Sequence, residues 1–216
     1  LMLTAADPAE AVTYFQRSAA EQPERLDFMR GLAASLVKAR RNSEAAIAWA
    51  KVVEHPDSTS DDRVELADAL IRNNDWARAE QVLDAIPPTH ETFKRYRLEA
   101  MIADGNQEWQ KADSFYEVAV GLTNTPATIL NNWGFSKLSR GDHTEAEQLF
   151  TDAIRQDPSL FTAKNNLVLA RGAQGNYTLP VMTMIQIERA ELLQTLGLAA
   201  VKRGDVEIGK GLLRDA

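Results

Sequence analysis

The chain has 216 residues, of which 44% are hydrophobic and 25% charged, a normal balance for a globular protein. A chain of this length buries a core large enough to fold without disulfides or metals, and it contains no cysteine for a disulfide, a thiolate zinc site or a nucleophile. Lysine and arginine total 24 against 31 aspartates and glutamates, so the net charge is −7. That acidity argues against a nucleic-acid partner, because binding to phosphate backbones depends on a basic surface.

No apolar run approaches the roughly 18 residues that a membrane-spanning helix needs. The sequence begins at Leu1 without an initiator methionine and ends at Ala216 within a predicted helix. We therefore expect a fragment of a longer protein, and a signal peptide or lipid anchor upstream stays open. The oligomeric state is equally open.

An alanine followed four residues later by a large side chain recurs along the chain. The pairs are Ala11 and Phe15, Ala45 and Trp49, Ala79 and Leu83, Ala112 and Tyr116, and Ala146 and Phe150. The successive alanines lie 34, 34, 33 and 34 residues apart. A second set of small residues keeps the same spacing: Ala33, Ala67, Ala100 and Gly134. Two registers with one period indicate a repeated structural unit.

This period and pattern resemble the tetratricopeptide repeat (TPR), whose unit is a pair of antiparallel helices. The small residues suit positions where paired helices cross, and the large residues suit the groove beside them. The resemblance implies an all-α fold, a right-handed solenoid of about 12 helices, formed as a single domain over the whole chain.

In chain order, the pattern predicts one helix over residues 8–20, the second helix of a truncated repeat. Helix pairs are expected from about residues 26, 60, 93 and 127. A further first helix begins near residue 161, after which the pattern breaks.

Pro180 stands where the next repeat alanine is expected, and a proline inside a helix costs roughly 3 kcal/mol. We therefore expect a degenerate repeat over residues 161–183, with an irregular connection over about 175–183 in place of its second helix. A final, truncated repeat is expected over about residues 187–216.

Residues that carry catalysis or bind metals are sparse. His55, His90 and His143 have no further ligand at metal-binding spacing and are expected in loops or at helix starts. The glycines stand singly, so the sequence has no phosphate-binding loop. We therefore expect no enzymatic activity, no metal and no cofactor.

The four tryptophans could form an aromatic platform for a ligand. In the repeat frame, however, Trp76 and Trp109 share one inter-helix position, Trp133 takes a core position and Trp49 takes the large-residue position. The frame therefore predicts that all four pack between helices.

The remaining candidate site is the groove lined by the first helix of each pair. Its predicted peptide-binding residues are Arg97, Met101, Asn131, Asn132, Phe135, Asn165, Asn166 and Leu169. The asparagine doublets lie 34 residues apart, and they resemble the asparagine ladder in the repeat domain of the O-linked sugar transferase. Such a ladder could bind a peptide backbone, because each amide offers an acceptor and two donors. The alternative is that these amides bond only to neighbouring helices.

Chaperone-binding TPR proteins hold a peptide's terminal carboxylate with lysine, asparagine and arginine residues at fixed positions. Asn132 could take the middle part of such a clamp, with Arg97 and Met101 before it and Thr162 and Asn166 after it. Three of these four cannot supply the required cation or amide, so an adaptor for chaperone tails is disfavoured.

Three stretches between Asn131 and Asp205 carry more than the general repeat pattern. They read NNWGFSKLSRGDHTEAEQLFTDAIRQDP, NNLVLARGAQGNYTLP and ERAELLQTLGLAAVKRGD. They resemble the TadD family, the repeat lipoproteins of the bacterial tight-adherence (Tad) pilus assembly system. The resemblance implies a lipoprotein on the periplasmic face of the outer membrane that helps the pilus secretin assemble or reach the membrane. The lipid-bearing cysteine of that family is absent from this sequence.

The leading functional hypothesis is therefore a non-enzymatic pilus assembly factor that binds an envelope partner, the pilus secretin or a pilus component, in its concave groove. Membrane attachment would come only through a lipid anchor outside this sequence. One alternative is a cytoplasmic TPR adaptor with another client. Another is the substrate-recognition arm of a larger enzyme.

Overall fold

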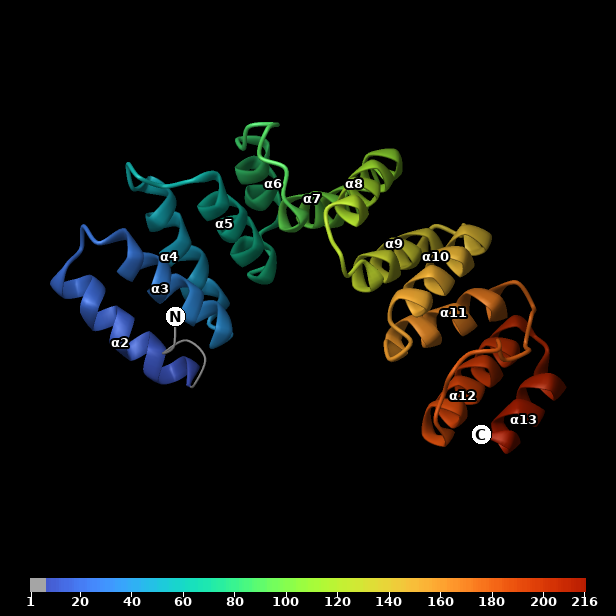
Figure 1. Cartoon of the computed structure of the whole chain (residues 1–216). Helices are drawn as coiled ribbons and strands as arrows, with labels where there is room; N and C mark the ends of the chain where they lie inside the picture. The colour runs from blue at the N-terminus through green and yellow to red at the C-terminus, as the bar shows by residue number, and fades with distance from the viewer. Residues whose placement is uncertain (1–6) are drawn as a thin grey trace. The chain divides into compact units, whose positions relative to one another are not determined.

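The computed structural model describes residues 7–216, which form twelve α-helices and, over that range, no β-strand (Figure 1). The helices are α2 (Pro8–Glu21), α3 (Leu26–Lys38), α4 (Asn42–Glu54), α5 (Ser60–Arg72), α6 (Trp76–Asp84), α7 (Phe93–Gly105), α8 (Trp109–Gly121), α9 (Ala127–Ser139), α10 (His143–Gln156), α11 (Phe161–Ala173), α12 (Gln186–Arg203) and α13 (Val206–Asp215). The predicted all-α fold is confirmed.

The start of α5 shows how the sequence sets a helix boundary. The Thr59 hydroxyl accepts a hydrogen bond from the backbone N–H of Asp62, and the Thr59 N–H donates to the Asp62 carboxylate at 2.8 Å. This capping box satisfies two amide groups that a helix start leaves without intrahelical partners. It places the first residue of α5 at Ser60, where the repeat period predicts it.

Each first helix ends in the same backbone motif. One residue adopts a left-handed conformation, and the next residue's N–H donates to the carbonyl five positions earlier, as from Asp142 to Lys137 at 2.9 Å. The left-handed residues are Arg40, Asn74, Gln107, Gly141, Gly175 and Gly204, with φ values of 57°, 62°, 62°, 90°, 79° and 102°. This Schellman motif satisfies the last carbonyls of each helix. The repeat therefore encodes a helix stop at a fixed position.

The chain divides into two compact units, Leu1–Glu108 and Trp109–Ala216. The division falls between α7 and α8, two helices that the period assigns to one repeat. The continuous solenoid over residues 1–216 therefore stays a prediction.

In the first unit, small residues allow close approach between helices. A Cβ added at Gly31 of α3 would lie 2.4 Å from the Phe15 ring of α2. The repeat alanines of this unit expose no surface, and they are Ala11, Ala33, Ala45, Ala67 and Ala79. A larger side chain at these positions would push the helices apart.

The second unit uses the same device at the crossing of α9 and α10. A Cβ added at Gly134 would lie 2.7 Å from the ring of Phe150, which is completely buried. Ala146 is also fully buried and packs with Phe150 in the core between α10 and α11.

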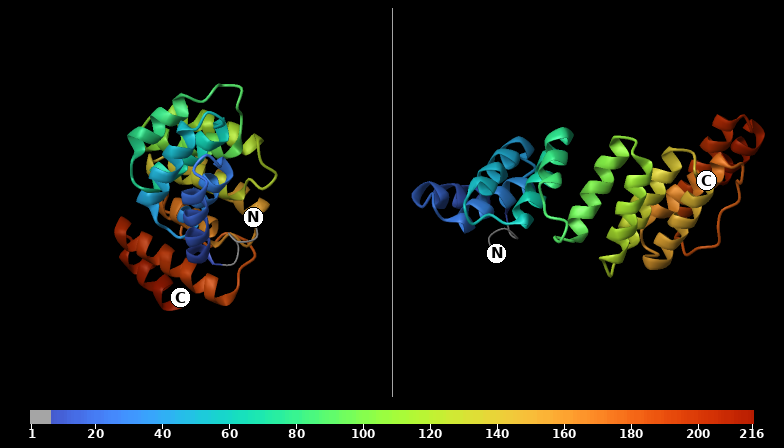
Figure 2. Two further views of the ribbon diagram at one scale, coloured as in Figure 1. Left: turned by 90° about the vertical axis from the view of Figure 1, so that its left-hand side faces the viewer. Right: turned by 90° about the horizontal axis from the view of Figure 1, so that it is seen from above.

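The second unit contains the predicted break in the repeat. Residues 174–185 form no helix, and they connect α11 to α12 along the outside of the helix ribbons (Figure 2). Leu179 and Met182 from this connection pack against the core of α11 and α12. The Tyr177 hydroxyl donates to the Asp205 carboxylate at 2.5 Å. The connection is thus a packed strap that replaces the second helix.

Candidate peptide-binding site

Three sides of α9 are occupied by neighbouring helices of the second unit. Toward α8, the Trp133 ring stacks on Tyr116 with centroids 6.1 Å apart. Toward α10, Gly134 lies against the buried ring of Phe150. Toward α11, Asn131 accepts a hydrogen bond from the Asn166 amide at 3.0 Å. The fourth side is free and carries Thr128, Asn132, Phe135 and Ser139.

The asparagine doublets form hydrogen bonds between neighbouring helices, but the bonds do not join equivalent positions of the two doublets. The buried pair is Asn131 with Asn166, 35 residues apart. The next pair of first helices repeats this arrangement: Asn165 of α11 accepts a hydrogen bond of 2.8 Å from the Thr195 hydroxyl of α12. Three of the four asparagines therefore use their amides to hold neighbouring first helices together. Asn132 forms no such bond within the described residues.

An apolar row follows the free side of the first helices. Phe135 of α9 and Leu198 of α12 expose 54% and 56% of their surface, and Leu169 of α11 is half-buried between them in the repeat register. We call Phe135, Leu169 and Leu198 the apolar stripe. Isolated exposed hydrophobic residues are ordinary, but apolar residues that recur at one repeat position on the free side mark a candidate surface for a partner.

Asp113 of α8 fixes the orientation of α9. Its carboxylate accepts hydrogen bonds from the Trp133 indole at 2.6 Å, from Lys137 at 3.0 Å and from Arg140 at 2.7 Å. Burial alone would raise the pKa of Asp113, but the hydrogen bonds from Arg140, Trp133 and Lys137 outweigh it and hold the pKa below the ordinary aspartate value. These contacts hold the helix that presents Phe135, the first residue of the apolar stripe.

Two predicted site residues, Arg97 and Met101, lie on α7 in the first unit. Met101 is half-buried and packs against the core of that unit. Arg97 lies 3.9 Å from the Asp68 carboxylate, which also contacts Lys94 at 3.1 Å. Lys94 bonds in addition to Glu65 at 2.7 Å. This face is therefore an ion-pair network.

A second charged contact joins α3 to α5 in the same unit. Arg30 donates two hydrogen bonds to Asp62, at 2.7 and 2.6 Å, and the aspartate side chain is only 5% exposed. Burial raises the pKa of Asp62, but the bonds from Arg30 and Thr59 outweigh that effect and lower it overall. The two-pronged geometry makes this pair stronger than an ordinary surface ion pair.

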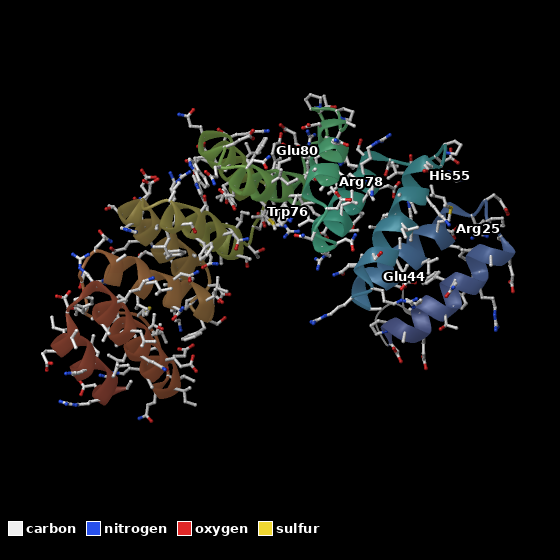
Figure 3. The ribbon with its side chains drawn as sticks, turned by 180° about the vertical axis from the view of Figure 1, so that it is seen from behind. Arg25, Glu44, His55, Trp76, Arg78 and Glu80 are labelled. Atoms are coloured by element: carbon white, nitrogen blue, oxygen red, sulfur yellow. The ribbon has the colours of Figure 1, made fainter. Side chains whose placement is uncertain are left out.

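The prediction that every tryptophan packs between helices is wrong for Trp76. This residue, labelled in Figure 3, starts α6. It exposes 39% of its surface, and its indole N–H donates to the Asn74 side chain at 3.0 Å. Trp49 is 4% exposed, as the repeat frame predicts. Trp109 has the same repeat position as Trp76 and also begins its helix, but it is half-buried, with the Arg140 guanidinium 5.7 Å from its ring centroid.

Sequence reasoning missed two features of the chain. One is the role of Asp113, whose partners come from the next helix and share no motif with it. The other is a cavity of about 540 Å³ between α2, α3 and α4 of the first unit, lined by apolar residues such as Leu32 and Leu36. Ile47 at its rim is 58% exposed. Neither the period nor the composition indicates such a cavity.

Within residues 7–216 no group of three or more histidine, aspartate or glutamate side chains could hold a metal ion. His90 contacts Asp61 at 3.0 Å, and His55 accepts a hydrogen bond from the Asp57 backbone at 3.1 Å. No helix in the described part of the chain is long and apolar enough to cross a membrane.

Comparison with known families matches residues 3–61 to the tetratricopeptide repeat. A search of curated protein sequences finds no significant match. Solved structures share the fold at low identity. The structure of MamA from Desulfovibrio magneticus is 19% identical with a TM-score of 0.65, covering 73% of this chain and 90% of that one.

Two further structures cover more of the chain. YrrB, described as a TPR protein with an unusual peptide-binding site, is 15% identical with a TM-score of 0.59, covering 91% of this chain and 96% of its own. The pilF protein of Pseudomonas aeruginosa is 14% identical with a TM-score of 0.63, covering 87% and 88%. The fold is thus that of TPR solenoids, which are generally scaffolds for protein–protein interaction.

Proposed function

We propose that the chain is a non-enzymatic scaffold that holds an extended segment of a protein partner on the free side of α9, α11 and α12. The observation that carries this proposal is the apolar stripe of Phe135, Leu169 and Leu198. Asn132 lies one turn from Phe135 on the same free side, with an amide available for a peptide group. An apolar row beside a free amide suits a peptide with alternating apolar side chains and an accessible backbone.

A photocrosslinking amino acid at Phe135 tests the proposed face in the native host. We expect one major crosslinked protein, identified by mass spectrometry, and we expect Leu198→Glu in the same chain to abolish that crosslink. The matched control places the crosslinker at Ile47, an equally exposed apolar residue of the first unit. Equal crosslinking at both positions, or a crosslink that survives Leu198→Glu, would contradict the proposal.

The finer proposal is that this partner belongs to a bacterial pilus assembly system, with the secretin as first candidate. It rests on the sequence resemblance to the Tad lipoproteins over Asn131–Asp205, and the shared fold with pilF is compatible with it. The corresponding location is the periplasmic face of the outer membrane, with a lipid anchor outside this sequence.

Envelope fractionation with metabolic fatty-acid labelling of the full-length protein tests that location. Labelled protein in the outer-membrane fraction is the expected result. Unlabelled protein in the cytosol would overturn the pilus proposal and leave an adaptor with another client. The crosslinking experiment is independent of this outcome, because it reports on the binding face and not on the compartment.

A further inference from the structure

The strap that replaces the missing helix ends in a segment with strand-like alternation, Val181–Ile185. Met182 and Met184 turn toward the core formed by α11 and α12. Between and beside them, Val181 and Ile185 expose 107% and 65% of their surface, and Thr183 is also exposed. The outward residues are all β-branched, the class that favours extended backbone. The segment thus has the side-chain pattern of a half-buried strand without a neighbouring strand.

The backbone of this segment is unpaired. Within the described residues, no hydrogen bond engages the N–H or C=O groups of Met182, Thr183 or Met184. Ile185 differs, because its N–H binds the Glu188 carboxylate at 3.2 Å and its C=O accepts from Arg189 at 2.9 Å. An exposed segment with free donors and acceptors is a template for another strand.

The charge distribution favours a second copy of this chain as the occupant. Residues 172–187 contain no charged side chain, although 25% of the whole chain is charged. Two copies that each carry a net charge of −7 repel one another over most of their surfaces. They meet without like-charge contacts along this uncharged segment, because the Glu188 carboxylate that binds the Ile185 N–H is itself paired with Lys164 at 2.9 Å.

The sequence of the segment is also self-complementary about Thr183. Val-Met-Thr-Met-Ile has the same order of residue types in both directions: β-branched residue, methionine, threonine, methionine and β-branched residue. We propose that two copies of the chain pair antiparallel through Val181–Ile185, about a two-fold axis at Thr183. Val181 then faces Ile185 of the second copy, and the two threonines face each other, a favourable cross-strand pair.

The free backbone groups select one register for this pairing. In an antiparallel pair, alternate residues exchange hydrogen bonds with the opposite strand. Met182 and Met184 have both groups free, so they form the ladder of about four hydrogen bonds across the axis. Thr183 then occupies the close, non-hydrogen-bonded position, and the helix cap at Ile185 is undisturbed. Pro180 has no N–H, which ends the ladder on its other side.

A cysteine crosslink tests this register, because the chain has no cysteine of its own. We expect Thr183→Cys to form a disulfide-linked dimer under mild oxidation, since facing residues at such a position lie at disulfide distance. Mixing the Val181→Cys and Ile185→Cys chains should give the mixed dimer in preference to either homodimer. The matched control is Thr178→Cys, exposed in the same strap but outside the pairing segment. Crosslinking of Thr178→Cys at the same rate would overturn the register.

Placing like charges at the proposed two-fold axis tests whether two copies of the chain associate there. Sedimentation equilibrium up to about 1 mM should show a reversible dimer, and so high a concentration is used because a two-stranded contact is marginally stable at best. Thr183→Glu should weaken that dimer by about tenfold or more, because two carboxylates then face each other. Thr178→Glu and Ile208→Lys, an exposed residue of α13, should leave it unchanged.

Circular dichroism of each variant confirms folding, and the exposed positions make unfolding unexpected. A chain that stays monomeric throughout this range would overturn the proposal. A dimer that survives Thr183→Glu but is lost in Ile208→Lys would overturn it as well, and would assign the contact to α13 instead.

Discussion

The two units solve one structural problem with different residues. Each first helix ends at a left-handed residue, which is Arg40, Asn74 or Gln107 in the first unit. In the second unit the same position holds Gly141, Gly175 or Gly204. Non-glycine residues in this conformation cost about 1 kcal/mol, and glycine avoids the cost. The position in the repeat therefore determines where each first helix ends, and the residue at that position changes only the stability of the turn.

The free faces of the first helices differ as well. In the first unit, Lys94, Glu65, Asp68 and Arg97 pair with one another. In the second unit the corresponding face carries the apolar stripe and amides. A surface whose charges are already paired gains little from a partner, whereas an exposed apolar row gains from being covered. This difference is the reason for placing the binding face on the second unit.

The largest expected effect tests whether the large residue of the repeat contributes equally to the free energy of unfolding in the two units. Phe150→Ala should lower the free energy of unfolding by about 3–5 kcal/mol, because the ring is fully buried against Gly134. Phe15→Ala should cost about half as much, because Phe15 is only half-buried against Gly31. Urea unfolding with hydrogen exchange resolved by residue measures both. Equal losses would contradict the stated difference between the units.

Asp113→Asn should destabilise the second unit by about 1–3 kcal/mol, because Lys137 and Arg140 lose their shared anion. The pKa of Asp113 is lowered in the folded chain, so its stabilisation is present above the ordinary aspartate pKa of about 4 and is lost as the pH falls through the folded value. The variant should therefore lose less stability than the parent as the pH falls below about 4. An unchanged acid titration of stability would count against the cluster.

Asparagine variants separate structural amides from the amide proposed to bind peptide. Asn166→Ala should cost about 1–3 kcal/mol, because it leaves the buried Asn131 carbonyl without its donor. Asn132→Ala should change stability by less than about 0.5 kcal/mol and should weaken partner crosslinking at Phe135. Thermal unfolding and the crosslinking yield measure the two effects. A stability loss in Asn132→Ala as large as in Asn166→Ala would erase the distinction.

The smallest expected effect exchanges the turn residues between units. Arg40→Gly should stabilise the first unit by up to about 1 kcal/mol, because it relieves the left-handed arginine. Gly141→Ala should destabilise the second unit by about 1 kcal/mol for the opposite reason, and space is not a factor because nothing lies within 4 Å of the added Cβ. Chemical denaturation of both variants should show shifts of opposite sign. Shifts of the same sign would mean that conformational strain does not control these turns.

The period and the spacing of small residues were sufficient to predict the helix pairs and the break at Pro180. Both depend on local preferences, since caps, turns and a proline's missing N–H act within a few residues. Periodicity also predicts which residues share one face of a helix, but the peptide-binding role of the face that carries Phe135 and Leu169 stays a prediction.

Local rules could not decide which partner each polar side chain finds. Asn131 bonds to Asn166 rather than to its equivalent Asn165, because the first helices pack one residue out of register. Asp113 accepts hydrogen bonds from two residues of α9 and from Arg140 just after it, and Trp76 stays exposed at the start of its helix. By itself, the sequence determined the repeat, its small residues at helix crossings and its interruption. Only the packing of one helix on the next decided which amides are structural and which side chains are left for a partner, because hydrogen bonds and ion pairs depend on ångström-scale distances between segments about 20 to 35 residues apart.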